Sequence, residues 1–86
     1  MNISVELTLT PLTDHFIPPI KTFIKALKTS GFTVLENPLS TQIYGSYDAL
    51  MPFLTDQIKA IFEAEESVIL FIKLVKGDRS NYISDI

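Results

Sequence analysis

Apolar and polar residues alternate strictly over positions 3–9, near the start of the chain. Successive side chains of a β-strand point to opposite faces, so this pattern predicts a half-buried strand from Ile3 to Leu9. Pro11 is expected to end the strand, because proline cannot donate a ladder hydrogen bond. The polar face of this strand would carry Ser4, Glu6, Thr8 and Thr10.

After Pro11 the apolar residues recur at three- and four-residue spacing, which is typical of an amphipathic helix. Thr13-Asp14 is a candidate cap, and Pro18 and Pro19 fit only the first turn. Gly31 is expected to take the left-handed C′ conformation after the helix. The residues with this spacing are Phe16, Ile17, Ile20, Phe23, Ile24 and Leu27. The stripe of Phe16, Ile20, Phe23, Ile24 and Leu27 is predicted to be core rather than a cofactor slot.

The second half of the chain predicts three further strands and one more helix. Strands are expected from Phe32 to Glu36 and from Ser40 to Gly45, paired as a hairpin, with Asn37-Pro38 between them as turn chemistry or a strand irregularity. A helix is expected from about Asp48 to Phe62 and a last strand from Ser67 to Val75.

Two details of these elements carry further expectations. Asp48 is the candidate N-cap of the second helix, and Pro52 requires a start no earlier than Tyr47. The core stripe of that helix would be Leu50, Leu54, Ile58, Ile61 and Phe62. The last strand is apolar on both sides, so both of its faces are expected to be covered.

The order β-α-β-β-α-β in a short chain predicts an α+β, ferredoxin-like fold, because right-handed crossovers return to one side of the sheet. The four-stranded antiparallel sheet would have the order 4-1-3-2, with both helices on one face. We expect one domain over 1–86, with an ordered core of about 2–76 and a polar tail over 77–86. An apolar edge strand and a helix-free sheet face together predict a homodimer or homotetramer.

Composition and charge narrow the function classes. The 86 residues are 47% hydrophobic and 20% charged, as in folded globular proteins. The net charge of −3, without a cluster of Lys and Arg, argues against nucleic acid. The longest apolar run, Val68 to Ile72, is too short to cross a membrane and the start has no basic region, so a cytoplasmic protein is expected. The absence of cysteine excludes disulfides and thiolate chemistry, and no cofactor is expected.

Polar and aromatic side chains collect on the helix-free face of the predicted sheet. A carboxylate, hydroxyls, an amide and aromatics suit a flat heterocycle with hydrogen-bonding edges. The alternative is that the same residues pair across a subunit interface or face water. The candidates are Glu6, Thr8, Ser40, Gln42, Tyr44, Phe71 and Lys73.

Other candidates favour structural roles. His15 is the single histidine and has no second ligand nearby in sequence, so a surface role is favoured over metal binding or catalysis. Asp78-Arg79 is interpreted as a solvated turn rather than an anion site.

The chain resembles the thiamine-binding (YkoF-like) family from Val5 to about Val75. The resemblance rests on Val5-Glu6-Leu7 with Pro11-Leu12, on Ile17-Pro18-Pro19-Ile20, and on Leu39-Ser40-Thr41-Gln42 followed by Gly45 and Asp48. It implies a ferredoxin-like domain that binds thiamine or its hydroxymethylpyrimidine half. The ligand-lining roles that it implies fall on Glu6, Thr8, Ser40, Thr41 and Gln42.

With Tyr44 added as a stacking aromatic, the six predicted ligand residues are Glu6, Thr8, Ser40, Thr41, Gln42 and Tyr44. Glu6 and Gln42 would match the edge of an aminopyrimidine, and Tyr44 or Phe71 would stack on the ring. Thr41 falls on the helix-facing side in a simple register, which requires either a bulge or a contact from beneath a helix. Thr10 departs from the family, because relatives often carry an aromatic there.

The function implied by the resemblance is non-enzymatic binding, as a carrier, buffer or sensor. The second hypothesis is a structural or regulatory oligomerisation module without a small ligand. A third is a small hydrolase of the acylphosphatase kind, which is disfavoured because no arginine lies beside the first helix.

Overall fold

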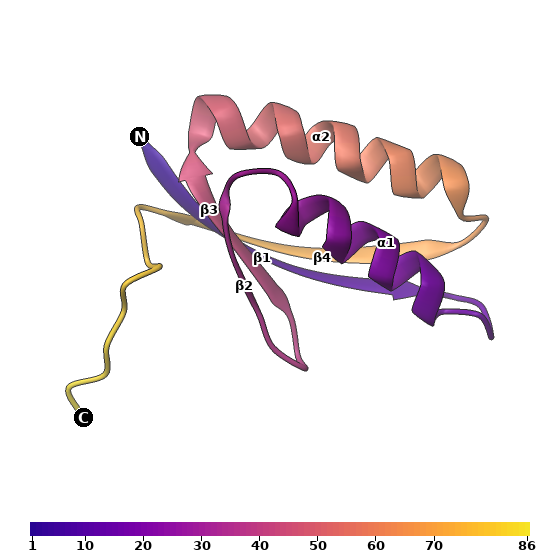
Figure 1. Cartoon of the computed structure of the whole chain (residues 1–86), viewed down its shortest axis with the longest axis horizontal. Coiled ribbons are helices and arrows are strands. Elements are labelled where there is room, and N and C mark those ends of the chain that lie inside the picture. Colours follow the sequence, from indigo (N-terminus) through magenta and orange to yellow (C-terminus); the bar gives the residue numbers. More distant parts are fainter.

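The computed structural model describes residues 1–86 and has its elements in the predicted order β-α-β-β-α-β (Figure 1). The strand and helix bounds agree with the sequence predictions to within about two residues. The elements are β1 (Asn2–Pro11), α1 (Ile17–Lys28), β2 (Thr33–Glu36), β3 (Thr41–Ser46), α2 (Tyr47–Ala64) and β4 (Val68–Lys76).

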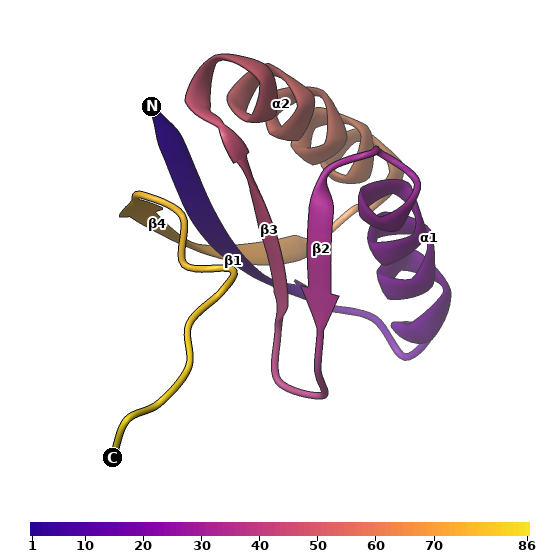
Figure 2. The ribbon, with the colours of Figure 1, turned by 60° about the vertical axis from the view of Figure 1, so that its left-hand side comes forward.

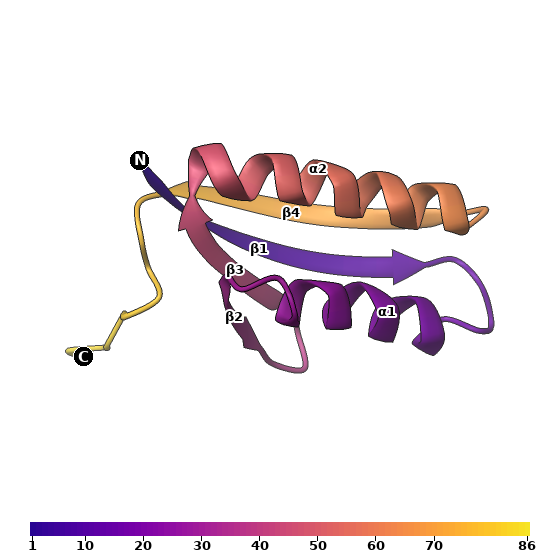
Figure 3. The same ribbon diagram turned by 45° about the horizontal axis from the view of Figure 1, so that its top comes forward.

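The four strands form one antiparallel sheet in the order β2-β3-β1-β4, which is the predicted order 4-1-3-2 counted from the other edge. Both helices lie on the same face of this sheet, and the other face carries no helix (Figures 2 and 3). The ferredoxin-like α+β fold is therefore confirmed.

The core lies between the sheet and the two helices and is built from nine buried apolar side chains. Leu27 of α1, Ile43 of β3 and Leu50 of α2 have no exposed surface. The complete set is Ile3, Val5, Leu7, Phe23, Leu27, Ile43, Leu50, Leu54 and Ile61. Burial of this cluster is the main term that stabilises the fold.

Two aromatic residues that were predicted to be core are instead about half exposed. Phe16 has 48% of its surface exposed, because it is the residue before α1 and not part of the inward helical face. Phe62 is 50% exposed, because its neighbour Ile61 occupies the inward position in the last turns of α2.

The predicted helix caps are wrong at both N-termini. Phe16 is the N-cap of α1 and provides no side-chain hydrogen bond, whereas Thr13 Oγ1 accepts from the backbone N–H of His15 at 3.4 Å. Ser46, not Asp48, caps α2, because its extended backbone lets its Oγ accept from the N–H of Ala49 at 3.3 Å.

Proline and glycine positions near the helices agree in part with expectation. Pro18 and Pro19 lie in the first turn of α1, as predicted. Pro52 lies inside α2 and beyond its first turn, since the helix begins at Tyr47. Gly31 does take a positive φ of 91°, but it lies two residues past the C-cap Thr29 rather than directly after it.

Gly45 in β3 is required by a close approach of a neighbouring ring. A Cβ at this position would lie 2.7 Å from Cδ1 of Phe32, which is shorter than carbon atoms tolerate. We expect Gly45→Ala to lower the free energy of unfolding by about 1–3 kcal/mol, because the Phe32 ring must leave its contact with Phe53. Urea denaturation measures this, and a Gly45→Ala variant as stable as the parent would contradict it.

Within one chain, the edge strand β4 is not covered on both faces, contrary to the sequence prediction. Ile69 and Phe71 on the helix-free face are 43% and 62% exposed, and Ile72 and Leu74 on the helix side are 46% and 53% exposed. The buried residues of the two helices pack over β1 and β3 instead. Within one chain, therefore, β4 presents apolar surface on both sides.

Candidate functional site

The six predicted ligand residues divide between two hollows that lie on opposite faces of the sheet. The first lies beneath α1 and is called here the α1 pocket; it has a volume of about 140 Å³ and contains Thr8, Ser40 and Thr41. The second lies on the helix-free face and is called the open-face hollow; it has about 150 Å³ and contains Glu6, Gln42 and Tyr44. The sequence prediction placed all six at one site, whereas in the structure they line two hollows, and Ser40 is hydrogen-bonded to Glu6 and Gln42 of the second.

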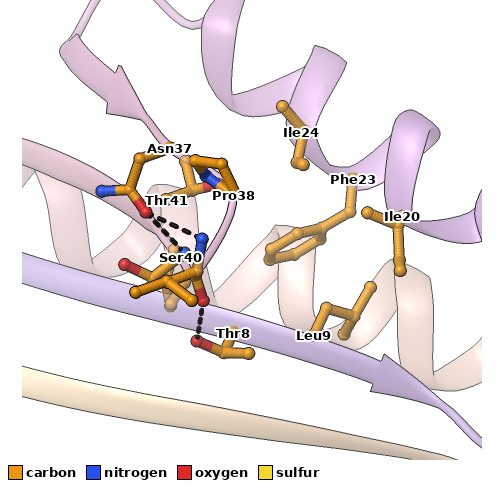
Figure 4. Close-up of a pocket in the computed structure, with 11 residues that line it drawn as sticks. Thr8, Leu9, Ile20, Phe23, Ile24, Asn37, Pro38, Ser40 and Thr41 are labelled. Carbon is orange, nitrogen blue, oxygen red and sulfur yellow. Dashed lines mark hydrogen bonds between the residues drawn. The ribbon is translucent and has the colours of Figure 1, made fainter.

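The α1 pocket has a polar end and an apolar end (Figure 4). The polar end lies at the loop between β2 and β3, and the apolar end lies under α1 against the end of β1. The polar groups come from Thr8, Asn37, Ser40 and Thr41, and the apolar walls from Leu7, Leu9, Ile20, Phe23, Ile24, Pro38 and Leu39. A small molecule with one hydrogen-bonding edge and an apolar body matches this division.

The loop at the polar end is held in shape by Asn37. Its side-chain Oδ1 accepts from the backbone N–H groups of Leu39 at 2.9 Å and Ser40 at 3.0 Å. The Asn37 backbone N–H donates to the Ser40 carbonyl at 3.1 Å, and Thr8 Oγ1 donates to the Leu39 carbonyl at 3.4 Å. This is the turn chemistry that Asn37-Pro38 predicted, and it fixes the polar groups before any ligand arrives.

Thr41 lies on the helix-facing side of β3, beneath α1. The β1–β3 register runs without a bulge through the pairs Glu6 with Gln42 and Leu7 with Thr41. Of the two arrangements expected from the sequence, the bulge is therefore wrong; Thr41 lies beneath α1, and its contact with a ligand stays a prediction. Thr41 is 5% exposed as a residue, and its hydroxyl oxygen, which makes no hydrogen bond within the chain, is not itself fully buried. This hydroxyl is an unpaired donor and acceptor in the wall of the pocket.

Ser40 links the two hollows through a chain of side-chain contacts. Its Oγ donates to Glu6 Oε2 at 3.0 Å and accepts from Gln42 Nε2 at 2.5 Å. Glu6 Oε1 lies 3.7 Å from Lys73 Nζ, and both of these side chains are partly exposed. The Glu6 carboxylate thus already has partners within the chain, and its contact with a residue of the α1 pocket is the one with Ser40.

The open-face hollow is closed at one end by the segment after β4. Ser4 is 6% exposed, and its Oγ donates to the Gly77 carbonyl and accepts from the Arg79 N–H, both at 2.8 Å. These bonds place Arg79 beside Tyr44 and Lys73 at the hollow. The Ser80 side chain, and then its backbone N–H, lower the pKa of Asp78 below its usual value.

The sequence analysis did not assign Phe23 and Asn37 to the site. Phe23 is 4% exposed and belongs to the core, as predicted, but its ring also forms a wall of the α1 pocket. Helical spacing indicates an inward face and not which part of that face meets a cavity. The aromatics predicted to stack on a ligand, Tyr44 and Phe71, lie on the helix-free face, away from this pocket.

Metal binding and membrane crossing are two further functions on which the structure bears. His15 is exposed on the loop before α1, in keeping with a surface role. No group of three or more His, Asp or Glu side chains is arranged to hold a metal ion. Neither helix combines the length and the apolar character that a membrane crossing requires.

The chain is similar to several solved structures. Protein SP2199 from Streptococcus pneumoniae is 26% identical, with a TM-score of 0.82 over 91% of this chain and 89% of that one. A proposed thiamine biosynthesis/salvage protein from Thermotoga maritima, TM0486, is 13% identical, with a TM-score of 0.77 over 86% of this chain and 82% of that one. A DUF77 domain of unknown function from Bacillus cereus is 19% identical, with a TM-score of 0.72 over 99% and 84%.

The Thermotoga and Bacillus structures show the fold alone, because their identity to this chain is low. No family model and no curated protein sequence matches the chain.

Proposed function

We propose that the chain is a cytoplasmic, non-enzymatic protein that binds thiamine or its hydroxymethylpyrimidine half in the α1 pocket, as a carrier, buffer or sensor. The observation that carries the proposal is the free hydroxyl of Thr41 in the wall of the α1 pocket, beside Ser40 and Asn37 and together with the apolar walls of Phe23 and Ile24. The sequence resemblance and a structural neighbour with a thiamine-related name support the same ligand class.

The size of the pocket favours the pyrimidine half over whole thiamine. Sites for drug-sized ligands usually enclose roughly 300–1,000 Å³, whereas the α1 pocket encloses about 140 Å³. A single six-membered ring with short substituents is the class of ligand that such a volume accepts. The thiazolium ring of thiamine would remain near the mouth.

The proposed roles follow from the two ends of the pocket. Thr41 donates to a ring nitrogen of the pyrimidine. Ser40, whose hydroxyl proton is already given to Glu6, accepts from the amino group, and Phe23 contacts the face of the ring. Glu6 polarises the Ser40 hydroxyl from the other side of the sheet. None of the eleven residues that line the pocket is an acid or a base, which favours binding over acid–base catalysis.

Isothermal titration calorimetry with the free hydroxymethylpyrimidine and with thiamine tests the proposal. We expect heat and a raised melting temperature with both ligands, and tighter binding of the pyrimidine because it enters the pocket whole. The absence of heat and of a thermal shift at millimolar concentrations of either ligand would refute the proposed function.

A second candidate function, a structural or regulatory oligomerisation module, is favoured by the exposed apolar residues of β4. A homodimer or homotetramer would cover Phe71 and Leu74, which are 62% and 53% exposed in the single chain. Sedimentation velocity at micromolar concentration measures this assembly, and a monomer would contradict it.

Glu6→Gln separates the two functions. If the chain is a binding protein, we expect ligand affinity to fall about fivefold, because a charge-assisted hydrogen bond to Ser40 becomes a neutral one. If it is only an assembly module, the same change alters the sedimentation coefficient, and neither parent nor variant responds to ligand. Calorimetry and sedimentation on the same two samples distinguish the outcomes.

A further inference from the structure

The outer side of α1 carries three of the chain's six lysines, at positions 21, 25 and 28. Together with Ile24 and Glu36 they line a shallow hollow between α1 and the end of β2. Ile24 also forms part of the wall of the α1 pocket. The lysine hollow and the α1 pocket therefore adjoin, with Ile24 as the residue that they share.

One of these three lysines forms an ion pair and the other two do not. Lys28 Nζ lies 3.0 Å from Glu36 Oε1 and is thereby paired. Lys21 and Lys25 take part in no ion pair, and both are exposed. The α1 pocket has no ionisable lining residue, and the charges that adjoin it through Ile24 are those of the lysine hollow, so an incoming charged ligand meets positive charge on this side. The net charge of −3 of the whole chain does not reflect this local excess.

We propose that the ligand of the α1 pocket carries an anionic substituent, and that Lys21 and Lys25 bind it at the mouth. This inference rests on the proposed function and refines it: a phosphorylated hydroxymethylpyrimidine is preferred over the free pyrimidine. The ring occupies the neutral pocket between Phe23 and Thr41, and the phosphate lies outside, in water, against the two ammonium groups. The thiazolium ring of thiamine is positively charged and is repelled by the same two lysines, so thiamine is disfavoured.

The proposal is tested by calorimetry at low ionic strength with the hydroxymethylpyrimidine and its monophosphate. Exposed ion pairs contribute about 0.2–1 kcal/mol each, so two of them predict roughly 2- to 30-fold tighter binding of the monophosphate. We expect this preference to shrink as salt is raised. It should also be lost in the double variant Lys21→Gln/Lys25→Gln, which retains affinity for the free pyrimidine.

The control is Lys59→Gln on α2, which removes one positive charge. Lys59 does not line the α1 pocket, and its Nζ lies 3.8 Å from Glu63 Oε1. The control should keep the preference for the monophosphate. Equal affinity of the parent protein for both ligands overturns this inference and leaves the proposed function standing. Loss of the preference in the control also overturns it, because the attraction would then be general. If neither ligand binds, the proposed function itself fails.

Discussion

Replacing Leu27 by alanine is expected to lower the free energy of unfolding by about 3–5 kcal/mol, because its side chain is fully buried where α1 meets the sheet and α2. Removal of the side chain leaves a cavity among residues that cannot all move to fill it. A domain of this size has a total stability of roughly 4–13 kcal/mol, so the variant would approach the limit of folding. Urea denaturation followed by circular dichroism measures the change.

The control for this prediction is Leu39→Ala. Leu39 has the same chemistry but is 84% exposed in the loop between β2 and β3. Its replacement is expected to change the free energy of unfolding by less than about 0.5 kcal/mol. Similar losses in the two variants would mean that α1 is not packed on the sheet as described.

Replacing Ser40 by alanine is expected to weaken binding of the hydroxymethylpyrimidine by about 5- to 50-fold, the equivalent of about 1–2.3 kcal/mol. The change removes a hydroxyl from the α1 pocket and also leaves Glu6 and Gln42 without their shared partner. Water can replace part of what these half-exposed groups lose, which sets the upper end of the range. Calorimetry measures the affinity, and circular dichroism verifies that the variant is folded.

Thr10→Ala is the matched control for the Ser40 variant. Thr10 lies on the helix-free face of β1, as Glu6 does. It is exposed and makes no side-chain hydrogen bond. Its replacement should leave affinity unchanged. If Ser40→Ala binds the pyrimidine as tightly as the parent protein, the α1 pocket is not the binding site, whereas an equal loss in Thr10→Ala would point to the open face as a whole.

The two hollows connected by Ser40 give the Glu6 and Ser40 variants a common interpretation. Glu6 contacts Lys73 and Ser40 on the helix-free face, where a second copy of the chain would pack, and Ser40 also lines the α1 pocket. A change at either residue therefore affects both the pocket and that face. For this reason, affinity and assembly should be measured together for each variant.

The sequence by itself determined the order of the elements and the fold. The alternation through Val5 and Leu7 and the helical spacing of Phe23 and Leu27 are local periodicities that each admit one element type, and connection rules then leave one sheet order. The exchange of turn hydrogen bonds at Asn37 is equally local. Alternation also places Glu6 and Gln42 on the same face of the sheet, but their direct pairing depends on the strand register, which the structure supplies.

Only the tertiary structure decided which of these residues share a cavity. Ser40 and Thr41 are neighbours in sequence, yet Thr41 points under α1 while Ser40 Oγ reaches Glu6 on the helix-free face, because a strand alternates its sides. Phe23 has the spacing of any core residue, and its place beside the pocket depends on how α1 is set over the end of β1. The exposure of β4 and the capping of α2 by Ser46 likewise depend on where the helices lie, which is a property of packing between distant segments and not of any local pattern.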